Sequence, residues 1–207
     1  LAIDNHIAAI ELGSTESMYT LCRLLLEDSA KAPLEHTSGV IMDPQRKISG
    51  AIELLEQAGA LCYAEAYLYL ARQSQRGDYL AASADSTNAY FAKAAELKNP
   101  GAIIRYARYI ASSPEQSAKT PIIPLLTELA ESGDAEAMVV LGNIYAKGVD
   151  VRPSTRKAIR WYKKAVAQVQ ASHHGDAAIV NEVAWTLAVT DRKGLHKPGY
   201  AQTIMDA

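Results

Sequence analysis

The sequence predicts an all-α protein, a right-handed α-solenoid of about five antiparallel helix pairs. The main observation is a repeated spacing of small and large residues, which is most complete between residues 133 and 166. The second is that glycine and proline stand near the ends of the repeated segments, where helices begin and end. The third is that the sequence lacks the alternating apolar and polar runs, bounded by turns, that indicate strands.

The first helix of each predicted repeat carries a small residue at one fixed position, directly after an apolar residue. The residues at this small position are Cys22, Ala71, Ala107, Gly142 and Ala184. Four residues before the apolar position the side chain is again mostly small, as at Ala137. Positions i, i+4 and i+5 share one side of a helix, so each first helix has a seam where a neighbouring helix can approach closely.

The second helix of each repeat supports the same register. Residues 158–165 align without a gap on residues 51–58, with two large side chains followed by Ala in both segments. Tyr90-Phe91 and Leu126 occupy the large positions in the repeats between them. Chance alignment of Ala-rich amphipathic helices is the alternative, but matches in both helices of four repeats argue against it. Large residues wedge against one neighbouring helix, and Ala lets the next one cross closely.

The fourth repeat carries two fuller motifs. They are Ala137-x3-Leu141-Gly142-x2-Tyr145-x2-Gly148-Val149 and Lys157-Ala158-x2-Trp161-Tyr162-x2-Ala165. On these motifs the chain resembles the Sel1-like repeat family, a branch of the tetratricopeptide class of solenoids. The other repeats match only in part, because Ser74 stands where the pattern has Tyr, and Ser112-Ser113-Pro114 replaces the glycine turn. The resemblance implies scaffolding of multiprotein assemblies, often in the bacterial cell envelope.

The repeats are expected to follow one another in a single domain. Their predicted bounds are 13–61, 62–97, 98–132, 133–174 and 175–207. Pro44 and Pro100 mark the first turn of a helix, where a missing N–H costs no hydrogen bond. Pro114, Pro121 and Pro124 predict a short or irregular second helix in the third repeat. Neither end resembles a polar capping repeat, so we expect a fragment of a longer protein.

Composition excludes several classes of function. The 207 residues carry a formal charge of −2, which gives no overall basic character for binding nucleic acid. No apolar run approaches the ~18 residues of a transmembrane helix. Cys22 and Cys62 lie more than two helical turns apart along the predicted axis, and a disulfide between them is not expected. The compartment stays open, with a lean to the periplasm or cell envelope that rests on the resemblance.

Candidate catalytic and metal-binding residues are few. Residues 13–17 lack the second glycine and the preceding strand of a nucleophile elbow. His173 and His174 are adjacent, so they do not share a helix face as zinc ligands at i and i+4 do. Glu53 and Glu56 share a face, but solvation explains them better than paired acid–base chemistry. We therefore expect no enzyme, cofactor or metal.

One set of residues indicates binding. In the related solenoids the residue after the small position points into the concave groove, and the resemblance implies the same here. These positions hold Arg23, Arg72, Arg108, Asn143 and Trp185, and Arg76 and Lys147 follow one turn later. Arginine presents a planar fork that suits a carboxylate or phosphate, so an aligned set can hold an extended acidic chain. An apolar row one turn earlier is expected beside it, formed by Tyr19, Leu68, Ile104 and Val139.

The sequence leaves alternatives open for these residues and for the function. Each arginine could instead pair with a local carboxylate from Glu16, Glu27 or Glu65, which would leave a solvated surface. The leading hypothesis is a non-catalytic module that holds a protein or peptide, with acidic groups, in the groove. A structural spacer that self-associates is the first rival. A hydrolase acting on cell-wall-type ligands is a weaker one.

Overall fold

The structure, a computed structural model, describes residues 9–10, 12–29, 44–112, 120–172, 177–190 and 194–205. Within these residues the chain forms the ten helices α2 to α11 and no strand, so the predicted all-α class is confirmed. The adjacent histidines His173 and His174 lie outside the described residues.

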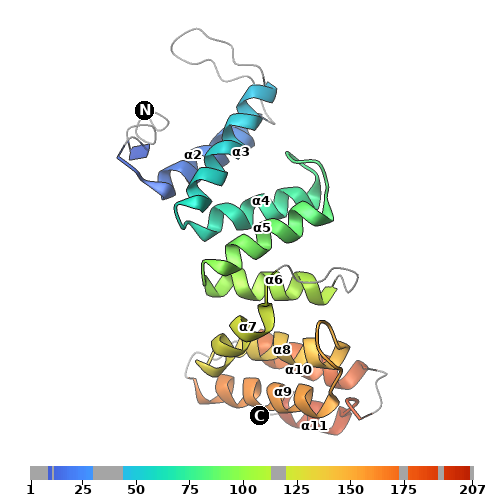
Figure 1. Cartoon of the computed structure of the whole chain (residues 1–207). Coiled ribbons are helices and arrows are strands. Elements are labelled where there is room, and N and C mark those ends of the chain that lie inside the picture. Colours follow the sequence, from blue (N-terminus) through green and yellow to red (C-terminus); the bar gives the residue numbers. More distant parts are fainter. Residues whose placement is uncertain are drawn as a thin grey trace. The chain divides into compact units, whose positions relative to one another are not determined.

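The helices follow the order of the predicted pairs (Figure 1). They are α2 (Thr15–Ser29), α3 (Pro44–Ala60), α4 (Ala64–Arg76), α5 (Ala84–Glu96), α6 (Pro100–Ser112), α7 (Ile122–Glu131), α8 (Ala135–Lys147), α9 (Thr155–Ala171), α10 (Ala177–Val189) and α11 (Pro198–Met205).

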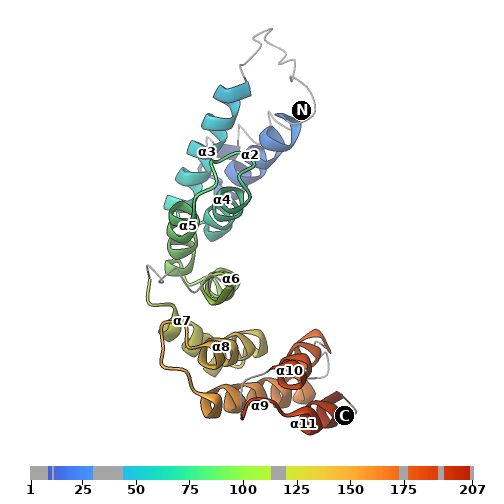
Figure 2. The ribbon, with the colours of Figure 1, turned by 90° about the vertical axis from the view of Figure 1, so that its right-hand side faces the viewer.

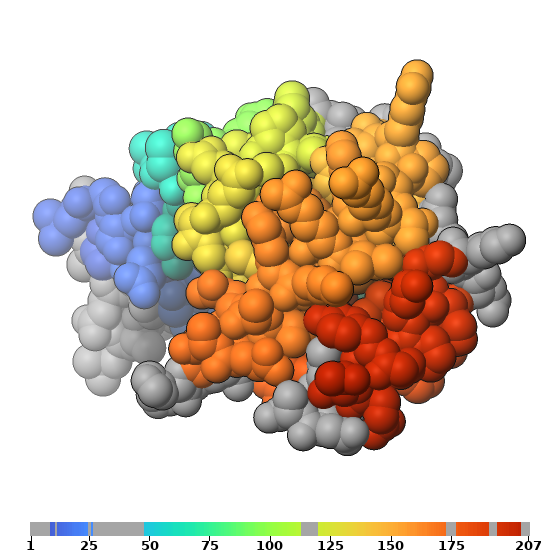
Figure 3. Space-filling model, turned by 90° about the horizontal axis from the view of Figure 1, so that it is seen from below, coloured from blue at the N-terminus to red at the C-terminus, as the bar shows by residue number. Residues whose placement is uncertain are grey.

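The helices pack as hairpins within two compact parts of the chain, which are described separately. In the N-terminal half, residues 1–102, α2 packs on α3, α3 on α4, and α4 on α5 (Figures 1 and 2). In the C-terminal half, residues 103–207, α7 packs on α8, α8 on α9, α9 on α10, and α10 on α11. Helices α9 and α11 lie at the surface of this half (Figure 3).

Local chemistry explains where the helices start and stop. Helix α6 begins at Pro100, and the Asn99 Oδ1 before it accepts a hydrogen bond from the Ala102 N–H at 3.0 Å. Asp134 Oδ1 caps α8 in the same way, through the Ala137 N–H at 2.8 Å. Helix α8 ends at Gly148, whose φ of 82° is a conformation that glycine adopts without steric cost. The predicted starts at proline and the glycine turn are confirmed.

The small positions form a buried seam, as predicted. All five are buried, from Cys22, Ala71 and Ala107, each 0% exposed, to Ala184 at 5%. At Gly142 the reason for a small residue is direct, since a Cβ there would lie 2.3 Å from Cε1 of Tyr162. The ring of Tyr162, in α9, therefore rests on the backbone of α8 and is itself fully buried.

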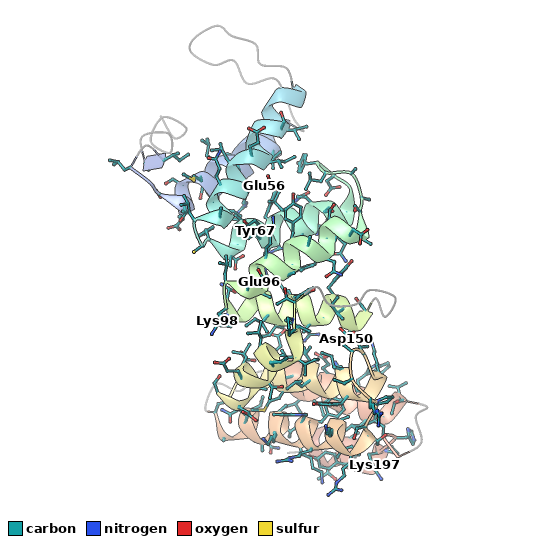
Figure 4. The ribbon with its side chains drawn as sticks, viewed as in Figure 1. Glu56, Tyr67, Glu96, Lys98, Asp150 and Lys197 are labelled. Carbon is teal, nitrogen blue, oxygen red and sulfur yellow. The ribbon has the colours of Figure 1, made fainter. Side chains whose placement is uncertain are left out.

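Tyrosines also join the helices of the N-terminal half. The ring of Tyr67, in α4, stacks on that of Tyr90, in α5, with centroids 6.4 Å apart. The Tyr90 hydroxyl donates a hydrogen bond to Glu56 Oε1, in α3, at 2.7 Å. Glu56 and Tyr67 are labelled in Figure 4. Lys93 Nζ lies over both rings, 5.3 Å from the Tyr67 centroid. These contacts link three successive helices.

The third predicted repeat differs from the others. Its second helix, α7, has ten residues, against 17 for α3 and α9, which agrees with the short helix predicted from its prolines. Among the described residues, α6 does not pack extensively on α7, and α7 packs on α8 instead. Proline lacks the N–H that would continue a helix backwards, so Pro121 and Pro124 confine α7 to a short segment.

Candidate interaction faces

Two surfaces carry the predicted binding residues, one in each half of the chain. We call the exposed side of the first helices the first-helix face. In the N-terminal half it comprises Glu16, Tyr19 and Arg23 on α2, Tyr63 before α4, and Glu65, Tyr69, Arg72 and Arg76 on α4. In the C-terminal half it comprises Arg108 on α6, Glu136, Asn143 and Lys147 on α8, and Glu182 and Trp185 on α10.

Helix α4 aligns a carboxylate, a ring and two guanidinium groups on one side. Glu65, Tyr69, Arg72 and Arg76 are spaced four, three and four residues apart, which places them in one row. Arg72 is half-buried, and its Nε is a buried donor with no hydrogen-bond acceptor among the described residues. A buried donor without an acceptor costs about 1–3 kcal/mol. A hydrogen-bond acceptor placed at Nε of Arg72 would recover this cost.

Tyrosine rings surround this row. The ring of Tyr19 lies 5.5 Å from that of Tyr63 and 6.0 Å from that of Tyr69, with an edge-to-face angle of 87° to the latter. Arg23 Cζ lies 5.8 Å above the Tyr19 centroid, within the range of a cation–π contact. Burial, and after it the negative charge of Glu16, raises the pKa of Tyr63, so the hydroxyl stays neutral. The face thus combines tyrosine rings with arginines.

In the C-terminal half Arg108 already has carboxylate partners. Its Nη2 lies 3.1 Å from Glu182 Oε2 and 3.2 Å from Glu136 Oε1, and its Nη1 donates to Glu182 Oε1 at 3.4 Å. Burial lowers the pKa of Arg108, but the hydrogen bonds and charges of Glu182 and Glu136 outweigh it, so the pKa is raised overall. The side chain remains 42% exposed.

Glu182 also connects Arg108 to Asn143. The Asn143 amide donates to Glu182 Oε1 at 3.2 Å, and Asn143 Oδ1 accepts from the Tyr162 hydroxyl at 2.7 Å. Burial, followed by the charge of Glu182, raises the pKa of Tyr162 well above its ordinary value. A single network therefore runs from the exposed guanidinium into the core, through residues of α6, α8, α9 and α10.

Lys147 and Trp185, the remaining predicted residues of this half, differ in their contacts and in their exposure. Lys147 Nζ donates to the Ala111 carbonyl at 3.0 Å, near the C-terminal end of α6, where a cation is favoured. Trp185 is 72% exposed. This is unusual, because tryptophan has the largest side chain and is mostly buried on average. Val189, one turn later on α10, is 51% exposed. An apolar contact point therefore lies next to the charged network.

The structure brings some predicted residues together and keeps others apart. Arg108 and Asn143 meet through Glu182, whereas Arg23 and Arg72 belong to the other half. The apolar row was predicted wrongly at three of its four positions, since only Tyr19 lies on the first-helix face. Leu68, Ile104 and Val139 are at most 6% exposed, so they belong to the core and do not form the floor of a groove.

Sequence reasoning missed Glu136 and Glu182, and it missed Tyr63 and Tyr69. Only carboxylates close in sequence were considered as partners, and Glu182 lies 74 residues from Arg108. A usable signal for Glu182 is its place one turn before Trp185, on the same side of its helix.

The described residues have neither a metal-binding cluster nor a membrane-spanning helix. They contain no group of three His, Cys, Asp or Glu side chains that could hold a metal ion. None of their helices has the length and apolar character needed to cross a membrane.

Comparison with known proteins agrees with this architecture. The family model described as Sel1 repeat matches residues 64–99, which contain the hairpin α4–α5, and residues 135–168, which contain α8 and all but the last three residues of α9. Among solved structures, a Sel1 repeat protein from Oxalobacter formigenes is similar, with a TM-score of 0.57 and 19% identity. That match covers 99% of this chain and 76% of the other.

A second solved structure is c5321, described as a protective antigen of uropathogenic Escherichia coli strains that displays an SLR fold. Its TM-score is 0.61 at 15% identity, and the match covers 99% of this chain. This chain spans only 40% of the length of that one. Among curated proteins no sequence matches the chain. At these identities the likeness concerns the fold.

Proposed function

Because this chain carries Sel1 repeats, we propose that it is a non-catalytic scaffold that binds protein partners on its first-helix faces. Sel1 repeats generally serve protein interaction, and stacked helical repeats present extended binding surfaces. The partner of the N-terminal face carries acidic groups, and nucleic acid is not its ligand.

The observation that carries this proposal is the state of Arg72. Its Nε is buried without an acceptor among the described residues, while the tyrosines beside it offer ring surface. A carboxylate from a partner would remove the cost of the unpaired donor and form a charge-assisted hydrogen bond. Tyrosine and arginine are also the residue types that most often dominate the energy of protein interfaces.

The C-terminal face contributes differently. Glu136 and Glu182 offset the positive charge of Arg108. We therefore propose that Arg108 orients a partner through polar contacts and does little to attract an anion. Trp185 supplies the apolar anchor, since a tryptophan that is 72% exposed loses much water-accessible area when a partner covers it.

Capture of proteins from a lysate of the source cells tests the proposal. We expect Arg72→Glu to reduce the captured partner at least about tenfold, because a carboxylate then faces the acidic groups of the partner. Lys98→Glu is the matched control, since it makes the same change of charge at another exposed residue. Circular dichroism should show equal helicity in all three proteins. If Arg72→Glu captures as much partner as the wild type, the proposal fails.

A structural spacer that self-associates is the second candidate, favoured by the exposed pair Trp185 and Val189 on α10. Light scattering separates the two roles. A mass that rises with concentration in the wild type, but not in Trp185→Ala, supports the spacer. A constant monomer mass supports the scaffold.

We further propose that the scaffold works in a bacterial cell envelope, as the family resemblance implies. The two solved structures described above come from bacteria. Fractionation of the source cells tests this, and recovery of the protein only with the cytoplasmic fraction would contradict it.

A further inference from the structure

Helix α9 carries a concentrated positive charge. Its 17 residues contain five cations and no carboxylate. The five are all exposed, and they are Arg156, Lys157, Arg160, Lys163 and Lys164. In the C-terminal half, α9 lies at the surface, and its orange atoms cross the face of the molecule that Figure 3 turns toward the viewer. The chain as a whole has a charge of −2, so this surface departs strongly from the average.

The lysines and the arginines of α9 have different surroundings. Three lysines lie against aromatic rings: Lys157 Nζ is 4.8 Å from the Tyr145 centroid, Lys163 Nζ 5.3 Å from that of Tyr200, and Lys164 Nζ 4.4 Å from that of Trp161. Within the described parts of the chain, neither Arg156 nor Arg160 has a carboxylate partner. Like charges one turn apart on a helix repel each other. No carboxylate partner of Arg156 or Arg160 in the described chain offsets this repulsion.

Arg156, Arg160 and Lys163 form a straight row. Their spacing of four and then three residues keeps them on one side of the helix, and the row is about 10 Å long at 1.5 Å per residue. A second helix with carboxylates at i, i+4 and i+7 has a row of the same length. Guanidinium groups match carboxylates in shape as well as charge, because the fork donates two parallel hydrogen bonds.

The basic surface is also bounded, which bears on the kind of partner. Helix α7 carries the exposed carboxylates Glu128 and Glu131. The turn after α7 reaches α9, since a Cβ at Gly133 would lie 3.4 Å from Gln168 Nε2. After Lys164, α9 contains no charged residue. A long polyanion such as a duplex or a lipid surface would extend over the α7 carboxylates, whereas a short acidic segment would not.

We propose that α9 docks an acidic helical segment of a protein partner, with its carboxylates paired to Arg156, Arg160 and Lys163. This surface is separate from the first-helix faces and lies on a second helix of its repeat. One chain then holds two partners at once, the arrangement that a scaffold requires. The docking on α9 does not depend on what the first-helix faces bind.

Synthetic helical peptides measured by fluorescence anisotropy test the proposal with the whole chain. One peptide has three Glu at i, i+4 and i+7, a second has the same composition with its Glu spread around the helix, and a third has Gln in place of Glu. We expect the first peptide to bind most tightly and Arg156→Gln with Arg160→Gln to weaken it at least about tenfold. Raising the salt from about 0.15 M to about 1 M should also weaken binding of the first peptide to the wild-type protein.

A matched control and a charge swap sharpen the test. Lys98→Gln with Arg105→Gln removes the same charge elsewhere and should change the affinity by less than about twofold. Arg156→Glu with Arg160→Glu should lose the Glu peptide and gain a peptide with Lys at the same three positions.

Three results would overturn the proposal: equal affinity for all three peptides, no effect of the α9 substitutions, or a charge swap that gains nothing. Binding of anionic phospholipid vesicles or duplex DNA that depends on Arg156 and Arg160, without binding of the Glu peptide, would assign the surface to that ligand instead.

Discussion

At the scale of single residues, the contact between Gly142 and Tyr162 decides how closely α8 and α9 approach. A Cβ at Gly142 would meet the buried ring at 2.3 Å, and the ring cannot move away without breaking its hydrogen bond to Asn143. We expect Gly142→Ala to lower the free energy of unfolding by about 1–3 kcal/mol, the usual cost of overpacking. Urea denaturation measures this.

Gly50→Ala is the matched control. Gly50 also lies in a helix, α3, but nothing stands within 4 Å of a Cβ built there. Alanine favours a helix over glycine, so this change should stabilise the protein by up to about 1 kcal/mol. If both substitutions had the same effect, close approach at the seam would not be the reason for glycine at position 142.

Tyr162 makes stability depend on pH in a defined direction. Its folded-state pKa is raised above the ordinary value of about 10, so the folded state holds the proton more tightly than the unfolded state does. The stabilisation is complete below pH 10 and is lost as the pH rises through that value, by up to about 1.4 kcal/mol per pH unit.

Tyr162→Phe removes this titration, so its unfolding free energy should fall less steeply above pH 10 than that of the wild type. The other tyrosines titrate in both proteins and cancel in the comparison. The variant should also lose about 1 kcal/mol at neutral pH, because Asn143 Oδ1 loses its donor. Parallel slopes above pH 10 would show that Tyr162 does not titrate as described.

Residue-level reasoning succeeded where one helix alone sets the outcome. Small residues at the seam, proline at helix starts and glycine at turns follow from spacing and local sterics. The apolar row was wrong for a geometrical reason. Four residues on an α-helix advance about 400°, so Leu68 and Ile104 are rotated about 40° from the arginines, toward the buried seam. Their apolar character belongs to the core.

At the scale of helices, the network around Glu182 joins three first helices of the C-terminal half. A double-mutant cycle of Arg108→Ala and Glu182→Ala measures the strength of one link. We expect a coupling of about 0.5–1 kcal/mol, because the pair is partly exposed and has two contacts of favourable geometry. A cycle between Arg108 and Glu131, which is not among its partners, should be additive. Equal coupling in both cycles would mean that the contact has no specific energy.

Partners of this kind could not be predicted from the sequence. Packing of hairpins decides which residue of α10 reaches Arg108, and the spacing within a single helix contains no information about that. The sequence predicted the positions of Arg108 and Asn143 on their helices but not the carboxylate between them. Glu182 changes the interpretation of the C-terminal face, because Arg108 already has acceptors there, whereas Nε of Arg72, in the other half, has none among the described residues.

At the scale of the whole molecule, charge is distributed unevenly along the chain. A formal charge of −2 suggested a neutral protein, yet α9 alone contributes five positive charges. Averaging over the chain hid this surface, and only its placement on one exposed helix makes it recognisable. The all-α class and its helical hairpins, in contrast, were visible in the sequence, because a recurring pattern adds evidence at each repeat.

Photo-crosslinking tests most directly whether the first-helix face of the N-terminal half binds a protein partner. Benzoylphenylalanine replaces either Arg76, exposed in the row of α4, or Glu53, exposed on α3. We predict crosslinks to a protein partner from position 76 that disappear when Arg72→Glu is added, and none from position 53. Equal crosslinking from both positions, or crosslinks from position 76 that survive Arg72→Glu, would contradict the proposed binding face.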